Sequence, residues 1–285
     1  MLFLVFNRPD LTNQVFKRIR EVEPNKLYIG SDGPREDILC DFAKIAEVRR
    51  ICSKVDWKCN VSHLYRETNL GCRDAVGSAI SWFFEHESEG IILEDDCLPD
   101  LSFFHYCEEL LSTYRDMNNI FLISGSNFLP SYPLKTSYVF SRLVLIWGWA
   151  TWRRAWKHYD TSMSEWLAYS KTNDLDYFAS QKSIVYKLLD DEYHNENERT
   201  WGTQWRYHCL LNSGLSIIPR SNLIKNIGFG RNDATRQIHT HIIANLPVVS
   251  MEFPLVHPRE ISPNRELDER SLEFYYKNKY KVSSS

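Results

Sequence analysis

The most informative part of the chain is Ile91–Asp100, with the sequence Ile-Ile-Leu-Glu-Asp-Asp-Cys-Leu-Pro-Asp. Its first three residues are apolar and predict a short buried strand. Three adjacent carboxylates follow, which we call the acidic triplet (Glu94, Asp95 and Asp96). Like charges at a strand end are unfavourable unless a cation or a ligand compensates them. Mg²⁺ and Mn²⁺ prefer oxygen ligands and commonly use one or two carboxylates together with substrate phosphates.

The acidic triplet also has a simpler interpretation. Asp95, Asp96 or Asp100 can cap the helix that follows, as part of a solvated acidic turn. The buried strand before the triplet, and the polar residues at the other predicted strand ends, favour a binding site over a cap. The segment therefore predicts a strand that carries a metal and phosphate site at its carboxyl end.

Short apolar runs alternate with longer helical patterns on both sides of this strand. Further strands are predicted at Leu2–Phe6, Leu27–Ile29, Val61–Tyr65 and Ile120–Ile123. Helices are predicted over Leu11–Val22, Ile38–Val55, Cys72–Glu87 and Leu101–Tyr114. This alternation is typical of an α/β fold with a mostly parallel sheet that helices cover on both faces. Ligands of such sheets bind beyond the carboxyl ends of the strands, where this chain carries polar residues.

The pattern changes after residue 130. A strand over Val139–Trp147 is expected. A Trp-rich stretch follows, in which Trp149, Trp152 and Trp156 fall at helical spacing, and then a polar helical stretch over Ser162–Glu198. Two more strands are predicted, at Ser216–Pro219 and Leu223–Ile227. We expect residues 1–130 and 131–258 to be two halves of one domain, and 259–285 to be a frayed tail.

Composition excludes several classes of protein. The formal net charge is -3, from 34 basic and 37 acidic residues, so a nucleic-acid partner is not expected. The seven cysteines form no CxxC pair, which argues against a zinc or redox site and for reduced thiols in the cytoplasm. The apolar start is too short for a signal peptide, and no apolar run approaches the roughly 20 residues that span a bilayer. Membrane contact is expected to be peripheral at most, at the inner face.

Several pieces of the chain, in this order, resemble bacterial GT-A glycosyltransferases distantly similar to N-acetylglucosaminyltransferase I. The matching pieces are Leu4–Pro9, Ser31–Pro34, Asn69–Arg73, Glu94–Asp96, Trp147–Trp152, Trp201–Trp205 and Asn226–Gly230. The resemblance implies a Rossmann-like GT-A fold with a C-terminal acceptor-side extension. Residues 1–130 would be its nucleotide-sugar-binding half and residues 131–258 the acceptor and catalytic half of the same domain. It also implies an inverting, metal-dependent transfer of a hexosyl or N-acetylhexosaminyl group from a nucleotide-sugar donor, expected to be a UDP-sugar, to a glycan or glycolipid acceptor in polysaccharide biosynthesis.

By position, the resemblance implies a role for individual residues. Asp96 would bind Mn²⁺ or Mg²⁺, and Glu94 and Asp95 would contact the ribose and the donor sugar. The residues implied at the nucleotide are Asn7, Arg8 and Asp32 in the base pocket and Arg73 near the diphosphate.

The acceptor side is less well defined. Trp147, Gly148 and Trp149 lie at the break before the predicted Trp-rich helix and are expected to line the acceptor cleft. An inverting reaction needs a base that deprotonates the acceptor hydroxyl. Relatives tend to carry an Asp beside the first Trp of the Trp201–Trp205 piece, but that Asp is missing here, and Glu198 is the candidate base.

Two other functions stay open at this point. A non-catalytic nucleotide-sugar-binding module would explain the missing Asp. A sugar nucleotidyltransferase would use a similar sheet, but it usually carries a glycine-rich, basic loop after the first strand, and the segment Asn7–Asp10 is not such a loop.

Overall fold

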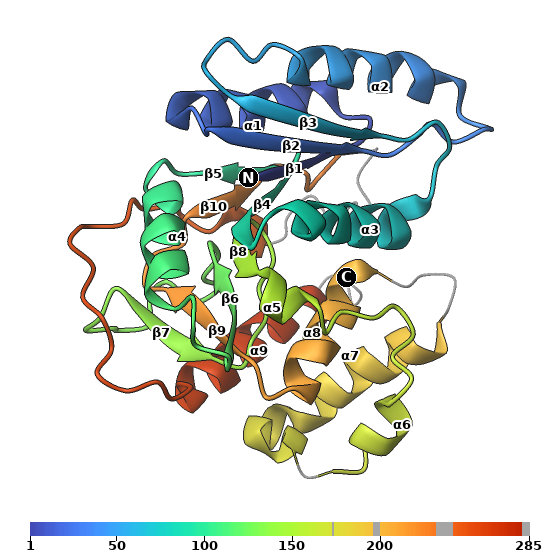
Figure 1. The fold of residues 1–285 in the computed structure, drawn as a ribbon. Helices are drawn as coiled ribbons and strands as arrows, with labels where there is room; N and C mark the ends of the chain where they lie inside the picture. The colour runs from blue at the N-terminus through green and yellow to red at the C-terminus, as the bar shows by residue number, and fades with distance from the viewer. Residues whose placement is uncertain (173, 196–199, 232–241, 281–285) are drawn as a thin grey trace.

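The structure is a computed structural model that describes residues 1–172, 174–195, 200–231 and 242–280. Within these residues, the largest sheet has eight strands in the order β3-β2-β1-β4-β8-β6-β9-β7 (Figure 1). The strands are β1 (Leu2–Val5), β2 (Lys26–Ser31), β3 (Asn60–Tyr65), β4 (Glu89–Glu94), β6 (Ile120–Ser124), β7 (Tyr138–Ser141), β8 (Trp149–Trp152) and β9 (Leu215–Pro219). All except β7 and β8 point the same way. The predicted α/β fold with a mostly parallel sheet is confirmed.

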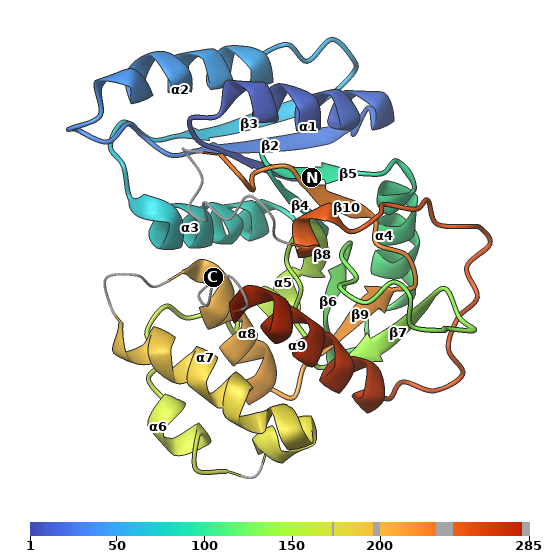
Figure 2. The ribbon, with the colours of Figure 1, turned by 180° about the vertical axis from the view of Figure 1, so that it is seen from behind.

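Helices cover both faces of this sheet (Figure 2). Those of the first half are α1 (Pro9–Val22), α2 (Leu39–Cys52), α3 (Gly71–His86) and α4 (Ser102–Thr113). Those of the second half are α5 (Arg153–Trp156), α6 (Trp166–Tyr169), η1 (Asp174–Gln181), α7 (Lys182–His194), α8 (Trp201–Leu211), η3 (Ile242–Asn245) and α9 (Arg265–Tyr280). Strand β5 (Cys97–Pro99) directly follows the acidic triplet and pairs with β10 (Ile224–Asn226) in a separate two-stranded sheet. The helices and strands predicted up to residue 124 agree with the observed ones to within a few residues.

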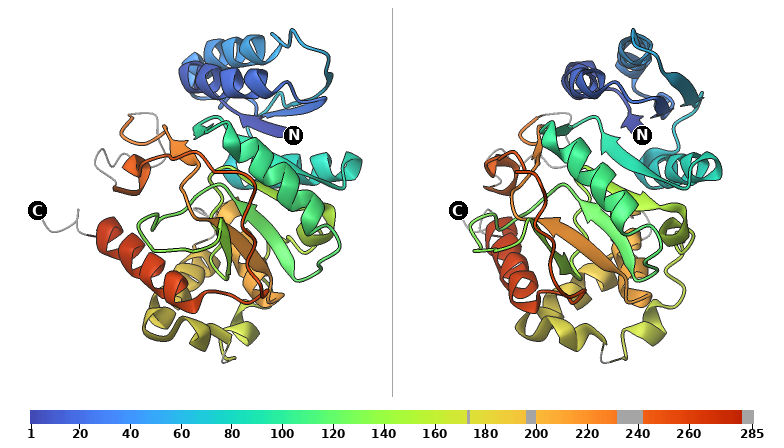
Figure 3. Two further views of the ribbon diagram at one scale, coloured as in Figure 1. Left: turned by 90° about the vertical axis from the view of Figure 1, so that its left-hand side faces the viewer. Right: turned by 60° about the vertical axis from the view of Figure 1, so that its left-hand side comes forward.

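Side chains that alternate along β1 contribute to an apolar cluster on each face of the sheet. Phe3 and Val5 point to one face and belong to a buried cluster that includes residues of α1, α2 and α4. Leu2 and Leu4 point to the other face and pack with residues of α3, α5 and α8. Because both faces are buried, the strand reads as a continuous apolar run. Figure 3 shows α1 and α2 at one end of the molecule, with α6 to α9 at the other.

The helical spacing of Trp149, Trp152 and Trp156 is misleading, because Trp149–Trp152 forms β8 and only Arg153–Trp156 is helical, as α5. This strand lies between β4 and β6 and is antiparallel to both. Trp149 belongs to the cluster on the α3 side and Trp152 to the cluster on the α4 side. A central strand that is apolar on both faces has no period of two, so the spacing of its tryptophans resembled that of a helix.

Two other expectations for the second half are corrected. The strand predicted over Val139–Trp147 ends at Ser141, since the next backbone N–H, that of Arg142, donates to the Asp268 carboxylate (2.8 Å). The tail predicted to fray contains α9, in which Leu267 and Asp268 are buried. Residues 281–285 lie outside the described residues. The predicted strands at Ser216–Pro219 and Leu223–Ile227 are confirmed as β9 and β10.

The stretch over Ser162–Glu198 is divided among α6, η1 and α7, which form a third apolar cluster with α8. Among the described helices, none is long and apolar enough to cross a membrane. All seven cysteines are free thiols.

Candidate active site

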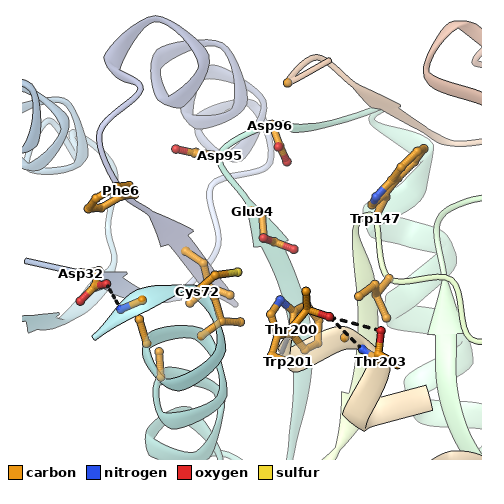
Figure 4. A pocket seen from close by; sticks show the side chains of 18 of the residues that line it. Phe6, Asp32, Cys72, Glu94, Asp95, Asp96, Trp147, Thr200, Trp201 and Thr203 are labelled. Atoms are coloured by element: carbon orange, nitrogen blue, oxygen red, sulfur yellow. Dashed lines mark hydrogen bonds between the residues drawn. The ribbon is translucent and has the colours of Figure 1, made fainter. Parts of the chain in front are cut away.

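A cavity of about 800 Å³ lies beyond the carboxyl ends of β1, β2 and β4, where the acidic triplet was predicted to act (Figure 4). Helices α7, α8 and α9 of the second half also contribute to its lining. The predicted site residues that line it are Asn7, Arg8, Asp32, Glu94, Asp95, Asp96 and Trp147. The fold therefore brings most of the predicted site together in one cavity.

Arg8 compensates two carboxylates of the acidic triplet. Its guanidinium forms an ion pair with Asp95 and donates to Asp96 Oδ2 at 3.0 Å. The side chains of Arg8 and Asp95 are 17% and 3% exposed, so this contact is well shielded from water. The sequence placed Arg8 in the base pocket, but its guanidinium is held at the triplet. It supplies one positive charge against three carboxylates.

One guanidinium does not offset the burial of these carboxylates. Burial, followed by repulsion from Asp96, raises the pKa of Glu94 to about 8. Burial also raises the pKa of Asp95 to about 6, although the positive charge of Arg8 opposes that shift. The cavity therefore has a deficit of positive charge at the triplet.

The donor atoms of the triplet fit a hard divalent ion. They are all carboxylate oxygens, and Asp96 lines the cavity. Within the described ranges, no three His, Cys, Asp or Glu side chains are grouped so that they could hold a metal ion by themselves. Any ion at Asp96 would take further ligands from a phosphate or from water, which is the usual arrangement for Mg²⁺.

Asn7 is positioned by a chain of polar contacts behind it. Its amide Nδ2 donates to Asp41 Oδ1 at 2.7 Å. The Asp41 carboxylate accepts two further bonds from the Arg35 guanidinium (2.7 and 3.0 Å), and Arg35 lies over the Phe6 ring at 5.5 Å from its centroid. Phe6, Asn7 and Arg35 all line the cavity. This end of the cavity therefore combines an aromatic ring with a fixed amide.

The Asp32 carboxylate accepts hydrogen bonds from several groups of the protein. It accepts from the backbone N–H groups of Gly33 (2.9 Å), Leu70 (3.0 Å) and Gly71 (3.1 Å), and from the Asn69 side chain (2.9 Å). It thereby satisfies the N–H groups at the start of α3. Asp32 lines the cavity as predicted, but its oxygens are already used in holding the α3 N-terminus.

Three predicted residues lie away from the cavity. Arg73 is not among the lining residues, and its guanidinium donates to Asp74 at 2.8 and 3.1 Å. Trp149 is 1% exposed and stacks on Trp201 at 5.7 Å between ring centroids, so the expected direct contact with an acceptor is corrected. Gly148 is buried at a φ of 58°, and an added Cβ would meet Ile224 at 2.5 Å. Gly148 and Trp149 are therefore buried residues that do not line the cavity themselves.

No role was predicted for several lining residues, most of which come from the second half. These residues are Phe128, Asn195, Thr200, Thr203, Arg206, Phe229 and Tyr275. Asp191 and Glu192, two carboxylates upstream of the candidate base, also line the cavity. Thr200 caps α8, because its hydroxyl accepts from the Thr203 N–H at 3.3 Å. A Thr-x-x-Thr spacing before an apolar segment was the available signal for that helix start. Glu198, the candidate base, lies outside the described residues.

Comparisons with known proteins give little beyond the architecture. No family model and no curated protein matches the chain. Among solved structures, it is similar to the apo form of mouse xyloside xylosyltransferase 1, with 12% identity and a TM-score of 0.35. That similarity covers 73% of this chain and 80% of the mouse chain.

Proposed function

We propose that the chain is an inverting glycosyltransferase that moves a sugar from a nucleotide-diphosphate donor to a glycan or lipid-linked acceptor. The observation that carries this proposal is the single cavity in which the acidic triplet lies between a polar end, with Phe6 and Asn7, and an aromatic end, with Trp147. A transferase has to hold a nucleotide sugar and an acceptor next to each other, and a cavity with two chemically different ends supports that task.

The polar end supports a nucleoside. The Phe6 ring offers a stacking surface for a base, and Asp41 fixes the orientation of the Asn7 amide for a hydrogen bond to the base edge. Asp32 contributes indirectly, by fixing the loop before α3. UDP is the first nucleotide to test, because the sequence motifs resemble those of transferases that use UDP-sugars.

The acidic triplet supports the diphosphate and donor-sugar part of the site. Asp96 would hold Mn²⁺ or Mg²⁺, and a bound ion would neutralise the negative charge that develops on the departing nucleoside diphosphate. Arg8 keeps Asp95 and Asp96 in place through its ion pairs. Glu94 faces the cavity between the two ends and would contact the donor sugar.

Transfer with inversion needs a general base on the acceptor side, and a carboxylate can serve as that base. The acceptor oxygen forms a bond to the anomeric carbon while the bond from that carbon to the phosphate oxygen breaks, and the acceptor proton passes to the base. Asp191 and Glu192 of α7 line the cavity and join Glu198 as candidates. The Thr200 N–H donates to Glu192 Oε1, so that carboxylate is already engaged and Asp191 is the stronger candidate of these two.

A thermal-shift measurement with nucleotides tests the proposal. UDP, GDP, ADP and CDP, and UDP-linked glucose, galactose and N-acetylglucosamine, are each added with Mn²⁺ and with a chelator. A ligand that binds the folded protein raises the melting temperature by mass action. We expect at least one nucleoside diphosphate to raise it, and to do so more strongly with Mn²⁺.

Two further outcomes define the limits of the proposal. If none of the four nucleotides raises the melting temperature, the central assignment is wrong. If UDP-sugars bind but neither hydrolysis nor transfer is detected with a panel of glycan acceptors, the chain is a binding module and the catalytic part of the proposal fails. A nucleotidyltransferase is disfavoured because α1 begins at Pro9, directly after Arg8, and leaves no glycine-rich loop for a triphosphate.

A further inference from the structure

Four aromatic rings form a continuous lining at one end of the cavity. They are Phe128, Trp147, Phe229 and Tyr275, which we call the aromatic wall, and each is only partly buried. Phe128 stacks on Tyr275, with ring centroids 5.9 Å apart and planes at 10°. Trp147 lies 5.2 Å from Phe128 and 5.4 Å from Phe229. The rings therefore contact one another in the order Tyr275, Phe128, Trp147, Phe229.

The aromatic wall borders the acidic triplet. Gly228, the residue before Phe229, packs so closely on Asp96 that an added Cβ would lie 2.5 Å from Asp96 Oδ2. Figure 4 shows Trp147 on the opposite side of the triplet from Phe6 and Asp32. A group that rests on the wall is therefore next to the position where a donor sugar would be held, and away from the base pocket.

The wall is held by separate parts of the tertiary structure. Phe128 follows β6, Trp147 precedes β8, Phe229 follows β10 and Tyr275 comes from α9. Helix α9 is itself attached to the sheet by buried Asp268, which accepts from the Ser141 hydroxyl (2.5 Å) and from the Tyr177 hydroxyl (2.8 Å). Partly exposed rings at a fixed position in a cavity are typical of a binding surface.

The chemistry of the cavity selects one kind of occupant for the wall. Aromatic ring faces carry partial negative charge and attract the C–H groups on the apolar face of a pyranose. Helices α7 and α8 add two carboxylates, Asp191 and Glu192, and one guanidinium, Arg206, to the lining. Hydroxyl groups therefore find acceptors there, and an anionic ligand meets net repulsion. A purely aliphatic ligand would displace water from the Asp191 carboxylate and offer it no hydrogen bond in return, which is unfavourable.

From this arrangement we infer that the aromatic wall is the acceptor subsite, and that it takes a neutral saccharide whose pyranose rings expose axial hydrogens on a face. The inference rests on the proposed function and adds the acceptor class. Trp147 is its central ring, since it contacts both Phe128 and Phe229.

Saturation-transfer NMR titrations test the inference on the whole chain, in the presence and absence of UDP and Mn²⁺. The neutral probes are cellotriose and chitotriose, the anionic probe is trigalacturonic acid and the aliphatic probe is octanol. We expect a neutral trisaccharide to bind at least ten times more tightly than the other two probes. Trp147→Ala should weaken that binding at least ten-fold, and Trp147→Phe should restore part of it. Phe42→Ala, which removes an exposed aromatic ring from α2 outside the cavity, should leave it unchanged.

Each other outcome has a defined meaning. UDP binding without saccharide binding, or saccharide binding that survives Trp147→Ala, overturns the acceptor subsite and leaves the proposed function standing. Preferred binding of octanol or of trigalacturonic acid overturns the acceptor class. Saccharide binding without any nucleotide binding overturns the proposed function and leaves a saccharide site. If Trp147→Ala does not fold, Phe128→Ala and Tyr275→Ala carry the same test, with the same expected loss.

Discussion

The two ends of the cavity are held by different kinds of contact. At the polar end and at the acidic triplet beside it, charged and hydrogen-bonding groups fix one another, as in the Arg8 ion pairs and the bonds from the α3 N-terminus to Asp32. At the aromatic end, ring contacts among Phe128, Trp147 and Tyr275 form the lining. The first kind is directional and depends on pH, while the second depends on shape and buried area.

This difference fits the two ligands that the proposed reaction requires, a charged donor and a neutral acceptor. The nucleoside diphosphate part of the donor is charged, and preorganised polar groups bind a charged ligand well. An acceptor offers mainly neutral hydroxyl groups and C–H faces, which rings from several segments can accommodate. The following predictions test whether the two ends respond as differently as their contacts indicate.

The largest effect is expected from Arg8→Ala. The substitution leaves the buried Asp95 carboxylate without its partner, which should lower the free energy of unfolding by about 3 kcal/mol or more. Urea denaturation at pH 7 measures the loss. The matched control is Arg18→Ala, because the Arg18–Glu21 pair is 40% and 44% exposed and should contribute about 0.5 kcal/mol or less. Equal losses in the two variants would mean that Arg8 does not organise the triplet.

The next effect concerns catalysis at the same end. Asp96→Asn keeps the shape of the side chain but removes a charge from the triplet. We expect kcat/KM to fall about 100-fold, which corresponds to ~2.7 kcal/mol, with little change in melting temperature. Steady-state kinetics with the donor identified by thermal shift provide the measurement. Glu47→Gln on the surface of α2 is the control, and Mn²⁺-dependent transfer at the wild-type rate would contradict the assignment of Asp96.

The third prediction concerns Asp268 of α9, the helix that carries Tyr275 of the aromatic end, and the pH dependence of stability. Burial raises the pKa of Asp268 to about 7, against the opposing effect of its hydrogen bonds and of Arg142. A carboxyl group whose pKa is higher in the folded state stabilises the fold at low pH and loses that contribution as the pH rises through the folded pKa. Between pH 5 and 7 the wild-type chain should lose about 2 kcal/mol through this group.

Asp268→Asn should flatten that pH dependence, because the amide does not titrate. Urea denaturation at pH 5, 6 and 7 compares the two proteins. Asp56→Asn, on an exposed ion pair with Arg20, is the control and should retain the wild-type slope. If the Asp268→Asn slope equals that of the wild type, the carboxylate is ionised throughout and anchors α9 as a charged group.

The smallest effect is expected at the start of α8. Thr200→Ala removes the hydroxyl that accepts from the Thr203 N–H, and a lost N-cap costs about 1 kcal/mol. Thr200→Ser keeps the hydroxyl and should retain most of the stability. Thermal unfolding of the two variants measures the difference. A loss of equal size in both would mean that the methyl group of Thr200, rather than its hydroxyl, matters.

The sequence predicted the first half well because its signals are local. The run Ile91–Leu93 was predicted as a strand and lies within β4, and Leu11–Val22 lies within α1. Period and length identify such elements without knowledge of their neighbours. The second half was harder, since Trp149 lies in a strand that is buried on both faces and α9 has few apolar residues to mark its packed side. Tertiary contacts decide such segments.

The alternation of strands and helices can be predicted from the sequence alone, and so can the three carboxylates at the end of a buried strand. The folded structure is needed to show that Arg8 pairs with Asp95, that Asp32 binds the α3 N-terminus, and that Tyr275 stacks on Phe128. The cause is distance along the chain. A periodic pattern reflects neighbours within a turn or a strand, whereas these contacts join residues that become neighbours only when the whole sheet and its helices have assembled.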